Sequence, residues 1–147
     1  ALPGCVWGGP SVCYHASMIP HEILKALAGE AARAHGLRLL VVFGSRARGD
    51  AHAASDWDLG FVGASAFDPD ELRAALVKML HTDHIDLVDL TRAGAQLRFR
   101  AARDGQSIFE AEPGQFGTFW LDAVSFWCDV QPILHAGYER VLADLGP

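Results

Sequence analysis

The chain has 147 residues, of which half are hydrophobic and a fifth are charged, and this composition is typical of one folded domain with a core. No apolar run reaches the ~18 residues that a membrane-spanning helix needs. The formal net charge of −6 arises in residues 104–147, which hold seven acidic residues and one basic residue. This distribution argues against a general nucleic-acid-binding protein and indicates a basic partner for the C-terminal region.

Residues 1–17 are rich in glycine and proline, and they predict an irregular N-terminal extension before a domain over residues 18–147. They lack the cationic and apolar stretches of a secretory signal, and Met18 is a candidate biological start. The cysteines Cys5, Cys13 and Cys128 form no paired framework, which favours a reducing cytoplasm.

The predicted elements alternate between helices and strands. Apolar spacing after Pro20 predicts a helix that stops at Gly36, and the apolar run Leu37–Phe43 predicts a buried strand. Further predicted elements are a turn and short helix at 44–49, strands at 57–62 and 84–90, a helix capped by Asp68 with Pro69 in its first turn, a helix at 93–104 closed by Gly105, a short candidate strand at 107–110 and a helical segment Gln115–Leu145 broken or kinked at Pro132. This order predicts a compact α/β domain.

The segment 41–60 carries a phosphate-binding pattern. Gly44 directly follows a predicted strand, and a glycine there lets the backbone turn sharply and approach a ligand closely. Ser45 and the amides after it open a helix, and a helix N-terminus favours phosphate. Arg46 and Arg48 add guanidinium groups, which suit phosphate oxygens. We therefore expect Gly44, Ser45, Arg46 and Arg48 to bind a nucleotide.

Carboxylates follow at metal-binding spacing. Asp56 and Asp58 are two residues apart, so on a strand both side chains project from one face. Neighbouring carboxylates repel each other, and a hard divalent cation such as Mg²⁺ is the usual compensation. A third carboxylate would complete a two-metal site for displacement at phosphorus. The strand at 84–90 offers Asp86 and Asp89 on opposite faces, and spacing alone does not choose between them.

Other polar residues have ordinary explanations beside functional ones. His84 shares a face with Asp86, where a partly buried strand histidine is the simpler interpretation. The basic cluster formed by Arg92, Arg98, Arg100 and Arg103 predicts a solvated helix face, with a triphosphate contact as the alternative for one of the four.

The whole pattern, Gly44-Ser45, ten further residues, Asp56-Trp57-Asp58 and a later strand aspartate, resembles the nucleotidyltransferase superfamily with the polymerase-beta-like fold. It is most similar to the minimal nucleotidyltransferases (MNT), from about Met18 to about Leu142. The resemblance implies an α/β (α+β) fold: a small mixed sheet with helices packed on one face, plus a C-terminal helical segment. It also implies that Asp86 joins Asp56 and Asp58 as catalytic residue and metal ligand. Asp89, at the end of its predicted strand, is expected to bond the turn at Thr91 and Arg92.

The resemblance extends to the antitoxin of HEPN/MNT toxin–antitoxin pairs, which in that family moves AMP from ATP to a tyrosine of the HEPN ribonuclease. It implies a cytoplasmic adenylyltransferase antitoxin that uses ATP and two Mg²⁺ ions, releases pyrophosphate and binds a HEPN-type toxin. Two alternatives stay open: transfer to a small molecule such as an aminoglycoside, and a catalytically silent neutraliser that only binds the toxin. The nucleotide, the acceptor residue, the number of AMP units and the oligomeric state also stay open.

The segment Gln115–Leu145 carries apolar residues over an arc of roughly 220°, about twice what one buried face requires. Either the helix is enclosed in the fold, or one edge packs on the domain while the other binds a partner or a second copy. For an interface, we expect an aromatic centre from Phe119, Phe126 and Trp127 and an acidic rim from Asp122 and Asp129.

Overall fold

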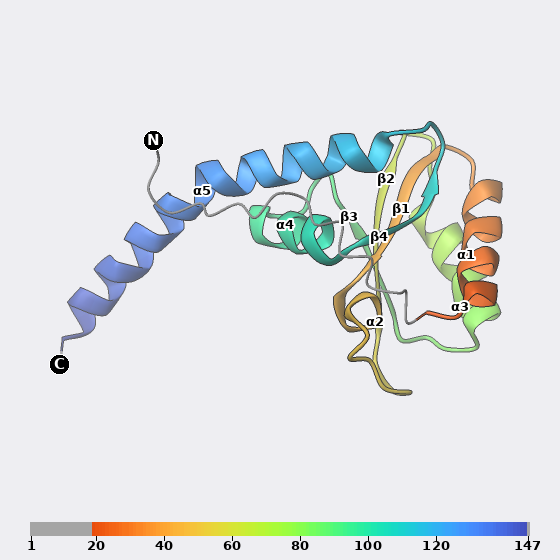
Figure 1. The fold of residues 1–147 in the computed structure, drawn as a ribbon, viewed down its shortest axis with the longest axis horizontal. Helices are drawn as coiled ribbons and strands as arrows, with labels where there is room; N and C mark the ends of the chain where they lie inside the picture. The colour runs from red at the N-terminus through yellow and green to blue at the C-terminus, as the bar shows by residue number, and fades with distance from the viewer. Residues whose placement is uncertain (1–18, 147) are drawn as a thin grey trace.

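The computed structural model describes residues 19–146 (Figure 1). The predicted N-terminal extension, with Cys5, Cys13 and Met18, lies outside the described residues. In chain order the elements are α1 (His21–Arg33), β1 (Leu37–Phe43), α2 (Gly44–Arg48), β2 (Trp57–Gly63), α3 (Pro69–Leu80), β3 (Ile85–Asp89), α4 (Ala95–Asp104), β4 (Gln106–Glu110) and α5 (Gln115–Leu145). Every predicted helix and strand is present, with bounds that differ by at most two residues.

The four strands form one mixed sheet in the order β3-β2-β1-β4. Strand β1 pairs antiparallel with both β2 and β4, whereas β2 and β3 run parallel. The parallel pair requires a crossover, and α3 supplies it. This arrangement confirms the predicted mixed sheet and makes β4 a full edge strand.

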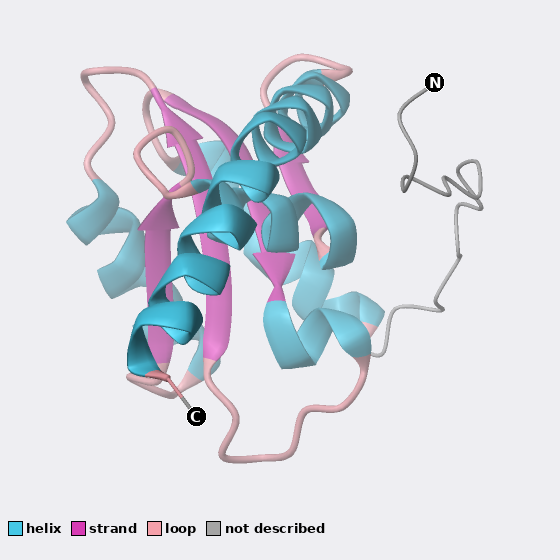
Figure 2. Ribbon diagram, turned by 90° about the vertical axis from the view of Figure 1, so that its left-hand side faces the viewer, coloured by secondary structure: helices cyan, strands magenta, loops and turns pink. Residues whose placement is uncertain are grey.

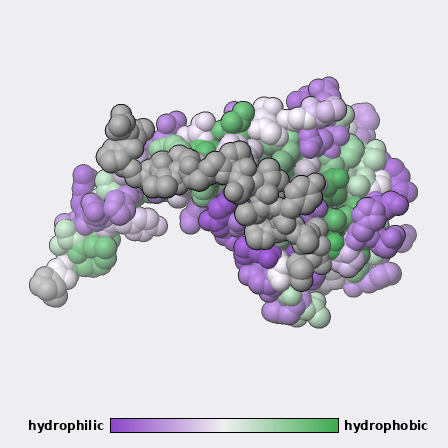
Figure 3. Space-filling model, viewed as in Figure 1, coloured by the Kyte–Doolittle hydropathy of each residue, from purple (hydrophilic) through white to green (hydrophobic). Residues whose placement is uncertain are grey.

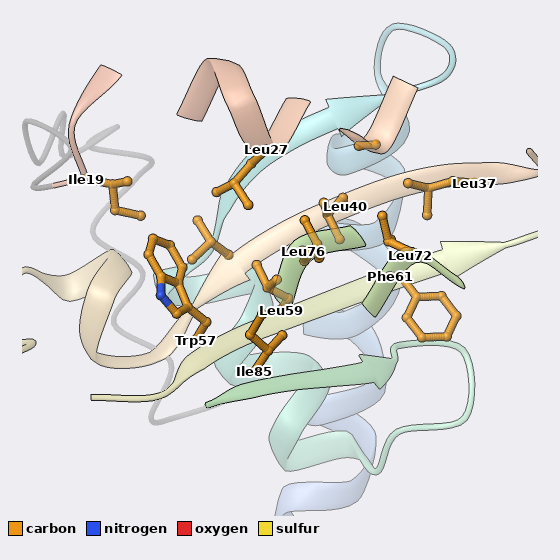
Figure 4. Close-up of a cluster of buried hydrophobic side chains, with 12 residues drawn as sticks. Ile19, Leu27, Leu37, Leu40, Trp57, Leu59, Phe61, Leu72, Leu76 and Ile85 are labelled. Atoms are coloured by element: carbon orange, nitrogen blue, oxygen red, sulfur yellow. The ribbon is translucent and has the colours of Figure 1, made fainter. Parts of the chain in front are cut away.

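Helices cover both faces of the sheet, which corrects the expectation of helices on one face. The reason lies in β1, where six of seven residues are buried, so that alternate apolar side chains need cover on each side. Leu40 and Val42 join a core cluster under α1 and α3, which Figure 4 shows in close-up. Leu39 and Val41 join a second cluster under α4 and the start of α5, the helix that crosses in front of the sheet in Figure 2.

Local chemistry sets two of the helix ends. The Asp68 carboxylate accepts hydrogen bonds from the amides of Asp70 and Glu71, and Pro69 stands in the first turn of α3, as predicted. Gly105 ends α4 in an extended conformation with φ −74°, so it is not a left-handed cap. A Cβ at Gly105 would collide with the carbonyl oxygen of Ala101, and this close approach requires glycine.

Helix α5 has 31 residues and continues through Pro132, so the predicted kink is present without a break (Figure 1). Its first half packs on the domain, with Phe119 and Ala123 buried. From residue 131 onward every described residue is exposed. We call residues 133–145 the distal arm; it projects away from the sheet in Figure 1. Within residues 19–146, no helix combines the length and apolarity needed to cross a membrane.

Candidate active site

The site begins where β1 passes into α2. Gly44 has φ +70°, a left-handed conformation that glycine adopts without steric cost. Phe43 is the register partner of Asp58 on β2, which places Asp58 beside the end of β1. A Cβ on Gly44 would collide with Oδ2 of Asp58, so the Asp58 carboxylate lies directly against the Gly44 backbone. The spacing of Gly44 and Asp58 in the sequence therefore corresponds to a direct contact.

Asp58 and Asp86 are neighbours on parallel strands. They are register partners in the β2–β3 ladder, so both carboxylates project from the same face of the sheet. Burial raises the pKa of Asp58 above its ordinary value, and the negative charges of Asp86 and Asp56 raise it further. Arg100 and Arg48 oppose this shift. The raised pKa of Asp58 is the electrostatic condition that a bound cation relieves.

Asp56 precedes β2, and its side chain is exposed. Its Oδ1 lies 3.1 Å from Nδ1 of His84, at the start of the neighbouring strand. The His84 side chain is 63% exposed, so it is not the partly buried strand histidine that the sequence suggested. Asp56 thus lies near the same ends of β2 and β3 as Asp58 and Asp86, but its side chain is turned towards His84.

The carboxylates of the site are chemically suited to Mg²⁺, although their side chains do not converge on one position in this structure. Across residues 19–146, no three His, Cys, Asp or Glu side chains stand close enough together to hold a metal ion. Asp58 and Asp86 nevertheless share one face in direct register, and Asp56 acts on the pKa of Asp58. Carboxylate oxygens are the ligands that Mg²⁺ prefers, and Asp56, Asp58 and Asp86 supply them near the starts of β2 and β3.

Asp89 serves the turn after β3, as expected. Its Oδ1 accepts hydrogen bonds from the Thr91 amide at 2.9 Å and from the Thr91 hydroxyl at 2.6 Å. Its Oδ2 lies 3.8 Å from Nε of Arg92. These contacts engage both carboxylate oxygens locally.

Arg46 lies on the face of β2 opposite Asp58. Its guanidinium stacks 4.3 Å from the centre of the Trp57 ring and donates to the Ser55 carbonyl at 2.6 Å. It also lines a cavity of about 240 Å³ with Ile19 and His52. Since neighbouring strand residues project to opposite faces, stacking on Trp57 directs Arg46 away from the carboxylates. Arg46 holds the loop before β2 in place.

Arg48 stands on the carboxylate side, where α2 meets α4. Its Nη1 lies 3.9 Å from Oδ2 of Asp104, and Arg103 binds the same carboxylate through two hydrogen bonds of 2.8 Å. The Arg103 hydrogen bonds hold the pKa of Asp104 below its ordinary value. Arg48 and Arg100 both act electrostatically on Asp58 and on Asp104.

Asp104 was not predicted as a site residue. A signal for it existed, because Arg100 and Asp104 are four residues apart and so share one face of α4.

A family model described as polymerase beta, nucleotidyltransferase, matches residues 25–113, more than half of the chain and all of Gly44, Ser45, Asp56, Asp58 and Asp86. The chain belongs to the polymerase beta nucleotidyltransferase family.

Within that family the chain is similar to the protein adenylyltransferase MntA of Aphanizomenon flos-aquae. The two are 30% identical over 96 residues, which are 56% of this chain and 63% of MntA. The matched part thus spans less than two thirds of that relative.

Solved structures of toxin–antitoxin complexes share the fold. A chain of a toxin–antitoxin structure with AMP-PNP superposes with a TM-score of 0.67 at 24% identity, covering 84% of this chain and 99% of that one. A chain from a complex of tri-AMPylated Shewanella oneidensis HEPN toxin with MNT antitoxin superposes with a TM-score of 0.61 at 21% identity, covering 81% and 98%.

Proposed function

We propose that this chain is a cytoplasmic antitoxin that transfers AMP from ATP to a tyrosine hydroxyl of a HEPN-type toxin. One observation carries the proposal: Asp58, which lies directly against Gly44, is the register partner of Asp86 on the neighbouring parallel strand. Family membership supports nucleotidyl transfer. The similarity to a protein adenylyltransferase supports AMP as the transferred group and a protein as the acceptor.

Asp56, Asp58 and Asp86 would hold two Mg²⁺ ions, which neutralise phosphate charge and lower the pKa of the acceptor hydroxyl. The Gly44–Ser45 turn would position the triphosphate through the backbone amides that open α2. Arg48 binds its oxygens from the α2 side. Arg46 supports this arrangement indirectly, through the loop before β2. These assignments follow from the direction in which each side chain projects.

The bond changes are those of an in-line displacement. The acceptor oxygen forms a bond to the α-phosphorus of ATP, and the bond from that phosphorus to the bridging oxygen of pyrophosphate breaks. Asp86 takes the proton of the hydroxyl as the new bond forms. The partial burial of Asp58 strengthens the local electrostatics.

The experiment combines the chain, Mg²⁺ and ATP with a HEPN-type toxin from the same organism, followed by mass spectrometry of that toxin. We expect additions of AMP units on a tyrosine, lost in Asp58→Asn and in Asp86→Asn. Asp89→Asn is the matched control, because Asp89 engages the Thr91 turn. With UTP added beside ATP, uridylyl additions, or phosphoryl additions from either nucleotide, would refute AMP transfer. Toxin neutralisation without any addition would indicate the silent neutraliser.

A further inference from the structure

The first half of α5 is part of the domain. Phe119 is buried against the second core cluster, and Trp127 stacks on Phe99 of α4 with ring centres 5.2 Å apart. Phe126 is partly covered by Arg98, whose guanidinium lies 5.4 Å from the ring centre. The aromatic centre expected for an interface is therefore largely used inside the fold. A partner surface has to be sought further along the helix.

The distal arm continues the same stripe without cover. At about 100° per residue, the positions of Leu134, Tyr138, Val141 and Leu145 fall within about 60° of one another and in line with Phe116 and Trp127. These four side chains are 42%, 70%, 57% and 75% exposed. Figure 3 shows hydrophobic colour on the projecting arm, apart from the body of the domain. The packing face of α5 thus extends beyond the surface that it packs against.

Two physical arguments require something to cover this face. An isolated helix of this length is marginally stable in water, because most helical stability comes from tertiary packing of the apolar face. Contiguous exposed apolar side chains are also typical of protein–protein interaction sites. Six of the eight large hydrophobic side chains exposed among residues 19–146 lie on the arm.

Charge selects the kind of partner. The arm carries two acidic residues, Glu139 and Asp144, and one arginine, Arg140; Nε2 of His135 lies 3.2 Å from the Glu139 carboxylate. Asp129 adds a further negative charge just before the arm, and Arg140 is the only Lys or Arg of residues 104–147. A second copy would bring acidic edges against acidic edges, which costs free energy. A partner with Lys and Arg around an apolar groove would instead gain complementary charge contacts at the rim.

We propose that the distal arm, residues 133–145, is a docking helix for a basic protein that receives Leu134, Tyr138, Val141 and Leu145 in an apolar groove. This is the helix-in-groove mode, with anchors at i, i+4, i+7 and i+11. The proposal rests on the proposed function only for the identity of the partner, the toxin that accepts AMP.

The test uses Tyr138→Glu with Ala136→Glu as its matched control. Both residues are exposed on the arm, and at about 100° per residue they lie on opposite sides of the helix. Each variant adds the same charge, so a difference in binding affinity between them shows which face of the arm the partner contacts. With a HEPN-type toxin from the same organism as probe, Tyr138→Glu should weaken binding at least tenfold, about 1.4 kcal/mol. Ala136→Glu should change binding less than twofold.

Hydrogen exchange locates the contact independently. Amides of residues 133–145 should exchange rapidly in the free chain and become protected when the probe is added. Equal binding by both variants, or protection confined to other segments, would overturn the docking helix. Sedimentation of the chain alone, with a dimer abolished by Tyr138→Glu, would assign the arm to a second copy and overturn the basic partner.

Asp58→Asn separates this proposal from the catalytic one. It should bind the probe as the wild type does while transferring no AMP. If Asp58→Asn transfers AMP normally, the proposed chemistry is wrong and the docking result stands. If Tyr138→Glu binds normally while Asp58→Asn is inactive, the docking helix is wrong and the chemistry stands.

Discussion

Replacing Gly44 with alanine tests the contact on which the site is built. At φ +70° a non-glycine residue costs about 1–2 kcal/mol. The added methyl group would also collide with the Asp58 carboxylate and have to displace it, which adds about 1–3 kcal/mol by analogy with overpacked cores. We expect Gly44→Ala to lower the free energy of unfolding by the sum of the two effects and to abolish nucleotidyl transfer.

Urea unfolding followed by tryptophan fluorescence measures the loss of stability. Gly29→Ala is the control: Gly29 lies inside α1, and its added methyl group would meet no atom within 4 Å. That variant should gain about 0.5–1 kcal/mol, because alanine favours helix interiors over glycine.

A double-mutant cycle with Asp58→Ala isolates the collision. In that background, Gly44→Ala should cost mainly the backbone contribution, since the displaced carboxylate is absent. An equal cost in both backgrounds would show that the Asp58 carboxylate does not lie against Gly44. An unchanged unfolding midpoint for Gly44→Ala alone would refute the left-handed conformation as well.

Two further predictions concern the carboxylates. The pKa of Asp58 is raised in the folded state, so the ionised carboxylate lowers the stability of the fold at pH values above its unfolded pKa. Asp58→Asn should therefore raise the melting temperature at pH 7 in the absence of Mg²⁺. This gain should vanish below about pH 4, where the carboxylate is protonated in the unfolded state as well. Added Mg²⁺ should stabilise the wild type more than this variant. The opposite sign holds for Asp104, whose lowered pKa gives stability that is present above its unfolded pKa and lost as pH falls through the folded pKa. Asp104→Asn should accordingly melt earlier at pH 7 and like the wild type in strong acid; a pH-independent difference would argue against the ion pair with Arg103.

The sequence predicted those parts of the fold that local chemistry determines. Strand β1 has the predicted bounds because its apolar run, interrupted only by Arg38, lies between Gly36 and Gly44. Helix α3 begins where predicted because Asp68 and Pro69 act within their own turn. The odd spacing of Asp86 and Asp89 shows that they project from opposite faces of the strand, but not which of them faces Asp58. The register of β3 against β2 settles this, because it places Asp86 beside Asp58.

Side-chain directions outside regular strands could not be predicted. Asp56 precedes β2, so strand alternation does not govern it, and its side chain meets His84. Arg46 belongs to a five-residue helix, and packing on Trp57 decides which face of the sheet it joins. The wide apolar arc of α5 correctly predicted more hydrophobic surface than one buried face needs. The sequence could not show that the first half of the helix packs on the domain while the distal arm stays exposed.

The continuity of α5 through Pro132 links the arm to the first half of α5, whose Trp127 stacks on Phe99 of α4, the helix that carries Arg100 and Asp104. The thirteen residues of the distal arm reach about 20 Å at 1.5 Å per residue. A protein held on this arm would present its tyrosine at an effective concentration of about millimolar or above, without any further contact near the phosphates. A free peptide bearing the same tyrosine would lack that advantage, so its KM should far exceed that of the intact partner while kcat changes little. Substrate selection would then be a property of tethering, exerted at a distance from the catalytic carboxylates.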